Sequence, residues 1–265
     1  MTQNALPLWF VFHDKKLLLF HDQTGEAALP RSEERPFAAP QGQDEPIHSL
    51  GVQQGIPCYA YALKTLPPEA EQQCTLIDLR SSYFVLGEPL YIIAGKGSEL
   101  IHWDFQTRFC PACGAPTQKK LPISKECSAC GNELFPNIAV ATIVLVRKED
   151  KALLVRAHTF RGTHYGLVAG FLEPGETLEQ CVAREVREET GITVNNIRYF
   201  DSQPWPYPCG LMVGFTANYV AGDISLQEEE LAAGAFFSRD ALPELPAKLS
   251  IARRIIDSWI EGRLP

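Results

Sequence analysis

The sequence predicts a protein of mixed α and β structure in three parts, residues 1–104, 105–135 and 136–265. Three observations lead to this division. The first part holds short apolar runs typical of strands, the second holds two cysteine pairs, and the third places an acidic helix after a glycine-led loop. A chain of 265 residues with 45% hydrophobic composition is long enough for two domains with separate cores.

The first part, residues 1–104, is expected to be rich in strands. Residues 8–12 and 17–20 are apolar runs on either side of a charged turn. The polar, proline-containing residues 22–48 predict a long surface loop. The first 20 residues lack the basic start and apolar centre of a secretory signal, so we expect a cytoplasmic protein with reduced thiols.

Two C-x-x-C pairs, each followed by glycine, mark the second part, residues 105–135. Cys110 pairs with Cys113, Cys127 pairs with Cys130, and 13 residues separate the pairs. Each pair can place two thiolates on one tetrahedral ion, so the spacing predicts a zinc ribbon. Because four cysteines leave no open position on the ion, the zinc is expected to be structural. Disulfides or a redox dithiol are the alternative, which a reducing compartment disfavours.

The third part opens with a β-rich run of nine residues, 138–146. A run of this length is too short to cross a bilayer, and no longer apolar stretch occurs, so we expect no membrane span. The loop and helix follow at residues 170–192, GFLEPGETLEQCVAREVREETGI. Thr177 and Gln180 form a capping-box signature and Gly191 is a C-cap signal, which together predict a helix of about 13 residues.

Three glutamates on this helix fall at positions i, i+3 and i+4 and project from one face: Glu185, Glu188 and Glu189. A solvated acidic face is the ordinary explanation of such a group. A carboxylate cluster on a rigid helix beside a glycine loop also supplies the oxygen ligands that Mg²⁺ or Mn²⁺ requires. Here the chain resembles the Nudix hydrolase family, whose signature these residues match at every defined position. The resemblance implies a Nudix α/β/α sandwich and metal-dependent hydrolysis of a nucleoside diphosphate linked to another group.

Residues 202–208, SQPWPYP, carry three prolines at alternate positions, which hold the backbone extended. Trp205 and Tyr207 on this stiff segment could stack on a flat ring or present a hydroxyl. A surface cover or a ligand for a partner that reads proline-rich segments is the alternative. Together with the ribbon and the glutamate helix, the segment resembles the NADH pyrophosphatase branch of the Nudix family, which also removes NAD caps from RNA.

This resemblance extends over about residues 79–259 and implies roles for single residues. The catalytic residues would be Glu185, Glu188 and Glu189, with Glu176 and Arg184 fixing the loop to the helix. Mg²⁺ or Mn²⁺ would be bound by Glu185, Glu188, Glu189, Glu230 and the carbonyl of Ala169. The substrate would be bound by Gln203, Pro204, Trp205, Pro206, Tyr207, Pro208, Cys209, Gly210, Glu230, Ala252, Arg80 and Phe135.

Two positions depart from the pattern of the branch. Gly210 stands where serine is common and Phe135 where tyrosine is common, and each change removes a hydroxyl. Glu126 is also out of register with a glutamate that the branch often carries between the cysteine pairs. Because such donors help to reject wrong ligands, the substrate is open between NAD(H) and a related compound such as ADP-ribose.

Three functions remain open. The first is hydrolysis of NAD(H) to NMN(H) and AMP, extending to NAD-capped RNA, and the second is hydrolysis of another nucleoside diphosphate derivative. The third is a non-catalytic RNA-binding protein, suggested by a basic group on the ribbon, although a net charge of −8 and a pI near 5.3 argue against a broad RNA-binding surface. That basic group consists of Arg108, Lys119, Lys120 and Lys125. The family resemblance also implies a homodimer.

Overall fold

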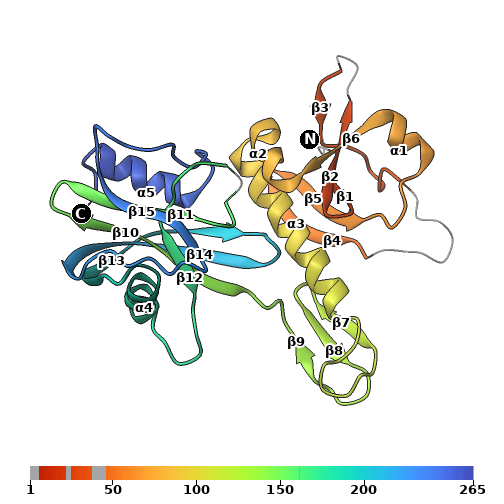
Figure 1. The fold of residues 1–265 in the computed structure, drawn as a ribbon. Coiled ribbons are helices and arrows are strands. Elements are labelled where there is room, and N and C mark those ends of the chain that lie inside the picture. The colour runs from red at the N-terminus through yellow and green to blue at the C-terminus, as the bar shows by residue number, and fades with distance from the viewer. Residues whose placement is uncertain (1–5, 22–24, 38–45, 161, 265) are drawn as a thin grey trace. The chain divides into compact units, whose positions relative to one another are not determined.

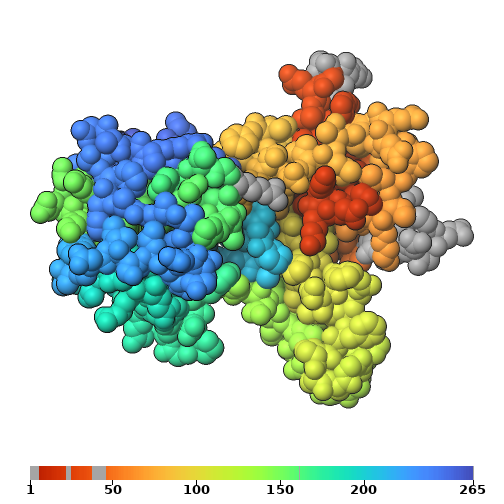
Figure 2. All heavy atoms as spheres, viewed as in Figure 1, coloured from red at the N-terminus to blue at the C-terminus, as the bar shows by residue number. Residues whose placement is uncertain are grey.

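A computed structural model describes residues 6–21, 25–37, 46–160 and 162–264 (Figure 1). The chain divides into two compact units. The first contains residues 1–137 together with Pro206–Cys209, and the second contains residues 138–205 and 210–265. The chain therefore passes between the units at residues 137–138, 205–206 and 209–210. Figure 2 shows the surface of the chain from the same side, with all heavy atoms drawn.

The first unit is built on a mixed sheet of six strands, counted over the described residues. The strand order is β3-β2-β1-β5-β4, and β6 pairs with β2. Strands β1 and β5 are parallel and the other pairs are antiparallel. The strands are β1 Leu8–His13, β2 Lys16–His21, β3 Ala27–Ala28, β4 His48–Gln53, β5 Ile56–Ala62 and β6 Cys74–Asp78.

Three helices accompany this sheet within the described residues: α1 Pro68–Gln73, α2 Leu79–Leu86 and α3 Glu88–Gln106. Helix α3 packs against β1, β4 and β5. Its buried Tyr91 and Trp103 share one core with Phe10 and Phe12 of β1, whereas Trp9 and Val11 belong to a second core. The apolar runs predicted β1 and β2 and gave no sign of these helices.

The surface loop predicted over residues 22–48 is only partly described, because residues 22–24 and 38–45 lie outside the described part of the chain. Ala27–Ala28 forms strand β3, which pairs with β2, and His48 begins β4, so the loop prediction is wrong for these three residues. Arg31 also makes an isolated bridge to Leu8. Backbone pairing with neighbouring strands therefore fixes part of a segment whose composition indicated only a loop.

The second unit contains another mixed six-stranded sheet, with order β13-β14-β10-β11-β15 and β12 paired to β10. Strands β10 and β14 are parallel, and the other pairs are antiparallel. The strands are β10 Ala139–Lys148, β11 Lys151–Ala157, β12 Val168–Phe171, β13 Thr193–Trp205, β14 Gly210–Ala221 and β15 Leu231–Ser238. Strand β10 contains most of the run predicted at residues 138–146.

Helix α4 Leu178–Thr190 and helix α5 Ile251–Ile260 belong to different cores of this sheet. Alternate residues of β10 supply the two cores, because successive side chains of a strand point to opposite faces. Val144 packs with Val182 and Val186 of α4, and Ile143 packs with Ile255 of α5. The second unit is therefore the α/β/α sandwich that the family resemblance implied.

The two large sheets follow one chain path. In each, a hairpin comes first (β1–β2 and β10–β11), and its first strand later pairs in parallel with β5 or β14. Strand β5 pairs with the preceding strand β4, and β14 likewise pairs with the preceding strand β13. The strand that follows, β6 in the first sheet and β15 in the second, pairs with the second strand of the hairpin, β2 or β11. The second unit adds α4, whereas the described residues between β2 and β4 contain no helix.

Helix α4 begins and ends where the sequence predicts. Thr177 is the N-cap, its hydroxyl accepts from the backbone of Gln180, and the Gln180 side chain accepts from the backbone of Thr177. Gly191 ends the helix in the left-handed conformation, with φ of 74°. The capping box and the C-cap are therefore both confirmed.

The zinc ribbon lies in the first unit, where β7 Thr117–Leu121, β8 Ser124–Cys127 and β9 Glu133–Leu134 form a small antiparallel sheet. No helix among the described residues is both long and apolar enough to cross a membrane.

Replacing the N-cap tests how much the cap stabilises α4. We expect Thr177→Ala to lower the free energy of unfolding by about 1 kcal/mol, because the backbone N–H of Gln180 loses the hydroxyl that accepts its hydrogen bond. Urea denaturation followed by circular dichroism measures the change. Thr177→Ser keeps the hydroxyl and is the control, so equal stability of the alanine and serine variants would contradict the assignment.

Candidate active site and zinc centre

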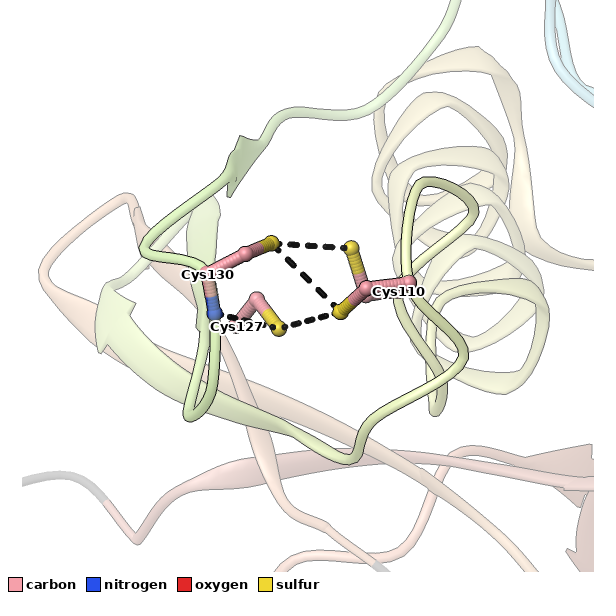
Figure 3. Close-up of side chains that lie close together, drawn as sticks. Cys110, Cys127 and Cys130 are labelled. Carbon is pink, nitrogen blue, oxygen red and sulfur yellow. Dashed lines mark hydrogen bonds between the residues drawn. The ribbon is translucent and has the colours of Figure 1, made fainter.

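The four cysteines of the ribbon face one another at close range, as Figure 3 shows for three labelled members. Their sulfur atoms all lie within 4.8 Å of one another, which is close enough to share one metal ion. Cys113 Sγ lies 3.4 Å from Cys127 Sγ and 3.5 Å from Cys130 Sγ, and Cys110 Sγ lies 3.7 Å from Cys130 Sγ. Four sulfurs at this spacing fit a tetrahedral zinc ion, whose bonds to sulfur are about 2.3 Å long.

Backbone N–H groups of the ribbon stabilise the thiolate form of Cys127. The N–H groups of Cys130 and Ala129 each donate to Cys127 Sγ at 3.5 Å. These hydrogen bonds lower the pKa of the Cys127 thiol. The thiolate is the form that binds metal, so the backbone favours the ligand form of this side chain.

Lys125 fastens the ribbon to the end of α3. Its side chain is buried, and Nζ donates at 2.8 Å both to the backbone carbonyl and to the carboxylate of Asp104. The ammonium also lies 5.4 Å from the centre of the Trp103 ring. A buried charge needs such partners, because desolvation without them is costly.

Three of the four basic side chains that suggested RNA binding contact other residues of the first unit. Lys125 is buried against α3, and Lys120 lies between Glu126 at 2.9 Å and Glu133 at 3.2 Å. The Arg108 guanidinium stacks on the Phe105 ring at 4.1 Å. The ribbon therefore offers fewer cationic groups for an outside partner than its sequence suggested.

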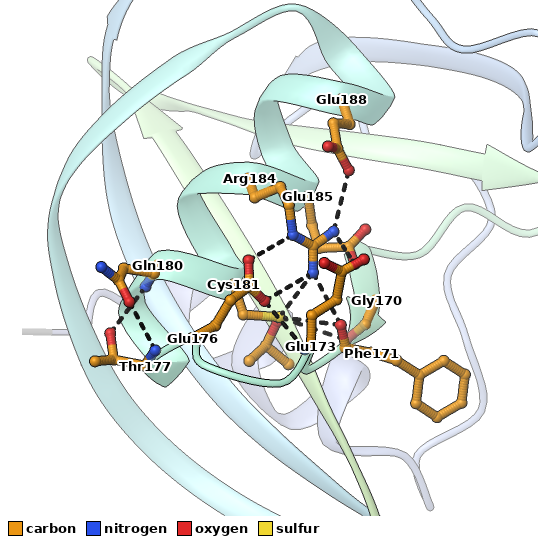
Figure 4. A network of polar contacts seen from close by, with 11 residues as sticks. Gly170, Phe171, Glu173, Glu176, Thr177, Gln180, Cys181, Arg184, Glu185 and Glu188 are labelled. Atoms are coloured by element: carbon orange, nitrogen blue, oxygen red, sulfur yellow. Dashed lines mark hydrogen bonds and ion pairs between the residues drawn. The ribbon is translucent and has the colours of Figure 1, made fainter.

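Arg184 connects the glycine-led loop to helix α4 (Figure 4). Its Nε donates to Glu176 at 2.6 Å, and its Nη2 donates to Glu176 at 3.0 Å and to the carbonyl of Phe171 at 2.9 Å. Its Nη1 donates to Glu185 at 2.8 Å and to Glu188 at 3.0 Å. The hydrogen bonds from Arg184 hold the pKa of Glu176 below its ordinary value. The predicted pair of Glu176 and Arg184 is therefore present and fixes the loop to the helix.

Glu189 is a buried acid among other acids. Its side chain is only 4% exposed. Burial first, then the charges of Glu185, Glu230 and Glu188, raises its pKa to about 8. No described residue donates a hydrogen bond or an ion pair to this carboxylate. An ionised carboxylate in this position needs a counter-charge, and a divalent cation with oxygen ligands fits the need.

Strand β12 runs close against the acidic face of α4. A β-carbon at Gly170 would lie 1.9 Å from Cδ of Glu185, so no other residue fits without moving that carboxylate. Burial raises the pKa of Glu185 although Arg184 bonds to it. Ala169, whose carbonyl is a predicted ligand, lies next to this contact and pairs with Ile143 of β10.

Glu230 lies in the turn before β15 and near the end of α4. Its carbonyl accepts from the N–H of His158 at 2.9 Å, and the N–H of Gln227 in the same turn donates to the carbonyl of Glu189 at 2.9 Å. Glu230 also raises the pKa of Glu185 and Glu189 through its charge. The predicted acidic residues are thus gathered at one place in the second unit.

Gln203 occupies a separate position in this unit. Its side chain is buried, with Oε1 accepting from the N–H of Ile251 at 2.7 Å and Nε2 donating to the carbonyl of Leu249 at 2.8 Å. Both amide groups are therefore engaged at the start of α5, directly before Ala252. Gly210 begins β14, where a β-carbon would lie 3.1 Å from the carbonyl of Trp205.

Pro204 and Trp205 end β13 in the second unit, whereas six other predicted substrate residues lie in the first unit. Residues Pro206–Cys209 belong to it, and the guanidinium of Arg80 lies 4.8 Å from the centre of the Tyr207 ring. Phe135 follows β9 and is 54% exposed. The set that the sequence predicted as one site is therefore divided between the two units.

One aromatic residue beside the acidic helix was not among the predicted residues. Phe171 ends β12, its side chain is 66% exposed, and its carbonyl accepts from Arg184. Figure 4 shows the ring pointing away from the polar network. An exposed aromatic ring directly after Gly170 offers a surface for a flat base. The position of an aromatic residue inside the glycine-led loop was the signal that could have identified it.

Comparison with known proteins agrees with this architecture. Residues 136–259 match the NUDIX domain, residues 7–103 match the NADH pyrophosphatase-like rudimentary NUDIX domain, and residues 106–135 match the NADH pyrophosphatase zinc ribbon domain. A crystal structure of a NUDIX hydrolase from Nitrosomonas europaea is similar in fold, with a TM-score of 0.50 and 24% identity. The similarity covers 59% of this chain and 92% of that one.

Two curated relatives are similar over most of their length, and both are named NAD-capped RNA hydrolase NudC. The protein from Pseudomonas aeruginosa strain LESB58 is 40% identical over 220 residues, which cover 82% of this chain and 77% of that protein. The protein from Stutzerimonas stutzeri is 36% identical over 263 residues, covering 97% of this chain and 91% of that protein. The chain therefore belongs to the Nudix hydrolase family, in the NADH pyrophosphatase branch that carries this zinc ribbon.

Proposed function

We propose that the protein hydrolyses the pyrophosphate of NAD(H) to give NMN(H) and AMP, and that it removes NAD caps from RNA 5′ ends. The observation that carries the proposal is the buried Glu189 on the helix with the Nudix pattern, near the charges of Glu185 and Glu188 of the same helix and of Glu230 before β15. The choice of NAD(H) is supported by the zinc ribbon and the proline segment. The relatives named NAD-capped RNA hydrolase support the RNA substrate.

In this proposal the acidic residues hold Mg²⁺ or Mn²⁺, and the ribbon holds a structural zinc ion. The divalent ions would be bound by Glu185, Glu188, Glu189, Glu230 and the carbonyl of Ala169, and zinc by Cys110, Cys113, Cys127 and Cys130. When bound, a divalent ion neutralises charge on the pyrophosphate and lowers the pKa of the attacking water. The ribbon offers no open ligand position and stabilises the fold of the first unit.

The chain's own residues orient this chemistry. Arg184 holds the loop through Glu176 and turns Glu185 and Glu188 toward its guanidinium, which fixes the positions of both carboxylates. Burial and the neighbouring charges raise the pKa of Glu189 to about 8, so this carboxylate is matched to accept a proton near neutral pH. Trp205 of the proline segment, and Phe171 beside the helix, supply aromatic surface for a base.

Product analysis tests the function directly. The purified protein is incubated with NADH, with ADP-ribose and with a short NAD-capped RNA, each with Mn²⁺ or with EDTA. Metal-dependent formation of AMP and reduced NMN from NADH, with a 5′-monophosphate end on the RNA, supports both activities. No turnover of any of the three compounds would contradict the proposal.

A second candidate is a hydrolase of another nucleoside diphosphate derivative, such as ADP-ribose. Gly210 and Phe135 favour it, because each lacks a hydroxyl that is common in the branch. Turnover of ADP-ribose without turnover of NADH would select this candidate.

We also propose a cytoplasmic homodimer. The cytoplasm keeps the ribbon thiols reduced for zinc, and all eight cysteines of the chain are free thiols in this structure. The homodimer rests on the family resemblance. Analytical ultracentrifugation distinguishes a dimer from a monomer.

Removing the charge of Glu189 tests its role. We expect Glu189→Gln to lower NADH turnover by at least about 100-fold, because the cation loses a ligand and the proton acceptor is gone. Circular dichroism should remain that of the wild type. Glu179→Gln, in the exposed first turn of the same helix, is the matched control and should keep full activity. A fully active Glu189→Gln protein would sink the assignment.

The raised pKa of Glu189 predicts the pH dependence of metal binding. Without metal, the pKa lies near 8 rather than at 4.5, so the protonated form prevails in the folded protein below pH 8. Mg²⁺ binds the ionised form, and its affinity should therefore fall as pH drops from 8 to 6, by up to about tenfold per unit. Calorimetric titration of Mg²⁺ at several pH values measures this slope. The slope should be smaller for Glu189→Gln, and an equal slope would show that another group titrates.

Zinc content tests the ribbon. The purified wild-type protein should contain one zinc ion per chain by atomic absorption, and Cys113→Ser should lose it and unfold more readily. Cys74→Ser changes a thiol outside the ribbon and is the control. Full zinc content in the Cys113→Ser protein would rule out a four-cysteine site.

A further inference from the structure

The loop that joins β13 to β14 is held by helices of the first unit. Residues Pro206–Cys209 belong to that unit, although the strands on either side of them belong to the second. Tyr207 is half-buried and packs against the core that contains α3. Within the first unit, three separate contacts hold this short segment.

The first contact is a hydrogen bond between two tyrosine hydroxyls. Tyr91 of α3 is 3% exposed, and its hydroxyl lies 2.9 Å from the hydroxyl of Tyr207. Burial, and then the contact with Tyr207, raises the pKa of Tyr91 above its ordinary value, so this phenol stays neutral. A buried hydroxyl that loses its partner is costly, and Tyr91 therefore favours one position of the loop.

The second contact requires a glycine inside a helix. Gly95 lies one turn after Tyr91 on the same side of α3. A β-carbon at this position would lie 3.0 Å from Cγ and 3.4 Å from Cβ of Pro206. Glycine lowers the stability of a helix relative to alanine, so its presence in mid-helix needs a packing reason. The close approach of Pro206 is that reason.

The third contact covers the ring of Tyr207. The guanidinium of Arg80 in α2 lies 4.8 Å from the ring centre, a distance typical of a cation–π contact. The hydroxyl of Tyr207 meets Tyr91, and its ring lies against Arg80 and the core. Tyr207 therefore anchors the loop to the first unit. Trp205, the other aromatic residue of the segment, ends β13 in the second unit and takes no part in these three contacts.

We propose that Tyr91 and Gly95 are positioning residues for the substrate loop, and that holding this loop is the task of helices α2 and α3. The inference rests on the proposed function, which makes residues 203–210 the substrate-binding segment. Gln203 fixes the start of the segment to the residues before α5, and Tyr91 and Gly95 fix its middle to α3. The segment is thus held at two points in the absence of substrate. This reduces the conformational entropy that the segment loses when the substrate binds.

Steady-state kinetics of three variants test the proposal. Tyr91→Phe removes one hydroxyl and Gly95→Ala pushes on Pro206, and each should raise the KM for NADH by about five- to tenfold, the size expected for one lost hydrogen bond. The kcat should stay within about twofold, because the acidic residues are untouched. Tyr83→Phe, in the neighbouring helix, is the matched control and should leave both constants unchanged. An unchanged KM in both Tyr91→Phe and Gly95→Ala would overturn the proposal.

The rate at which iodoacetamide labels Cys209 reports the loop without any substrate. Peptide mass spectrometry of the zinc-loaded protein should show severalfold faster labelling of Cys209 in Tyr91→Phe and Gly95→Ala than in Tyr83→Phe. Cys58, buried in β5, is the internal reference. Equal acceleration at Cys58 would mean general loosening and would overturn the proposal. If the wild type fails to cleave NADH but the Cys209 result appears, the proposed function falls and the anchoring of the loop by α3 stands.

Discussion

The burial of the Glu189 carboxylate is the constraint on which the arrangement around α4 depends. A carboxylate that is 4% exposed, with three other acids close enough to raise its pKa, destabilises the unit when ionised. The surrounding residues hold the loop and helix α4 in fixed positions. Arg184 ties the loop to the helix, the capping box fixes the start of α4, and Gly170 leaves room for Glu185. Each of these features keeps like charges together at a place where a cation can compensate them.

Local sequence signals predicted the parts of this fold that are determined locally. The helix over residues 178–190, its caps and the pairing of Glu176 with Arg184 depend on residues close in the chain, and the structure has all of them. The spacing of the cysteines likewise predicted four sulfurs near one another. Composition and periodicity did not reveal the helices of the first unit, because α3 is defined by its packing against β1, β4 and β5.

The candidate site shows the same limit. The acidic residues were predicted together, and the charges of Glu185, Glu188 and Glu230 all contribute to the raised pKa of Glu189. The position of Tyr207 could not be predicted, because its partner Tyr91 is 116 residues away and no local pattern links them. Phe171 was overlooked although its position inside the glycine-led loop was a signal, and the folded chain adds its exposure beside the acidic helix. Long-range contacts thus decide which aromatic residue of the proline segment anchors the loop.

The shared chain path of the two large sheets shows what the framework is without the acidic helix. Both sheets contain one parallel pair at the same place in the strand order, and only the second carries the acidic helix in the described residues. Residues 7–103 also match the NADH pyrophosphatase-like rudimentary NUDIX domain. Without an acidic helix in the described residues, what this framework can contribute is mechanical: its core is a rigid support for the segments that pack on it.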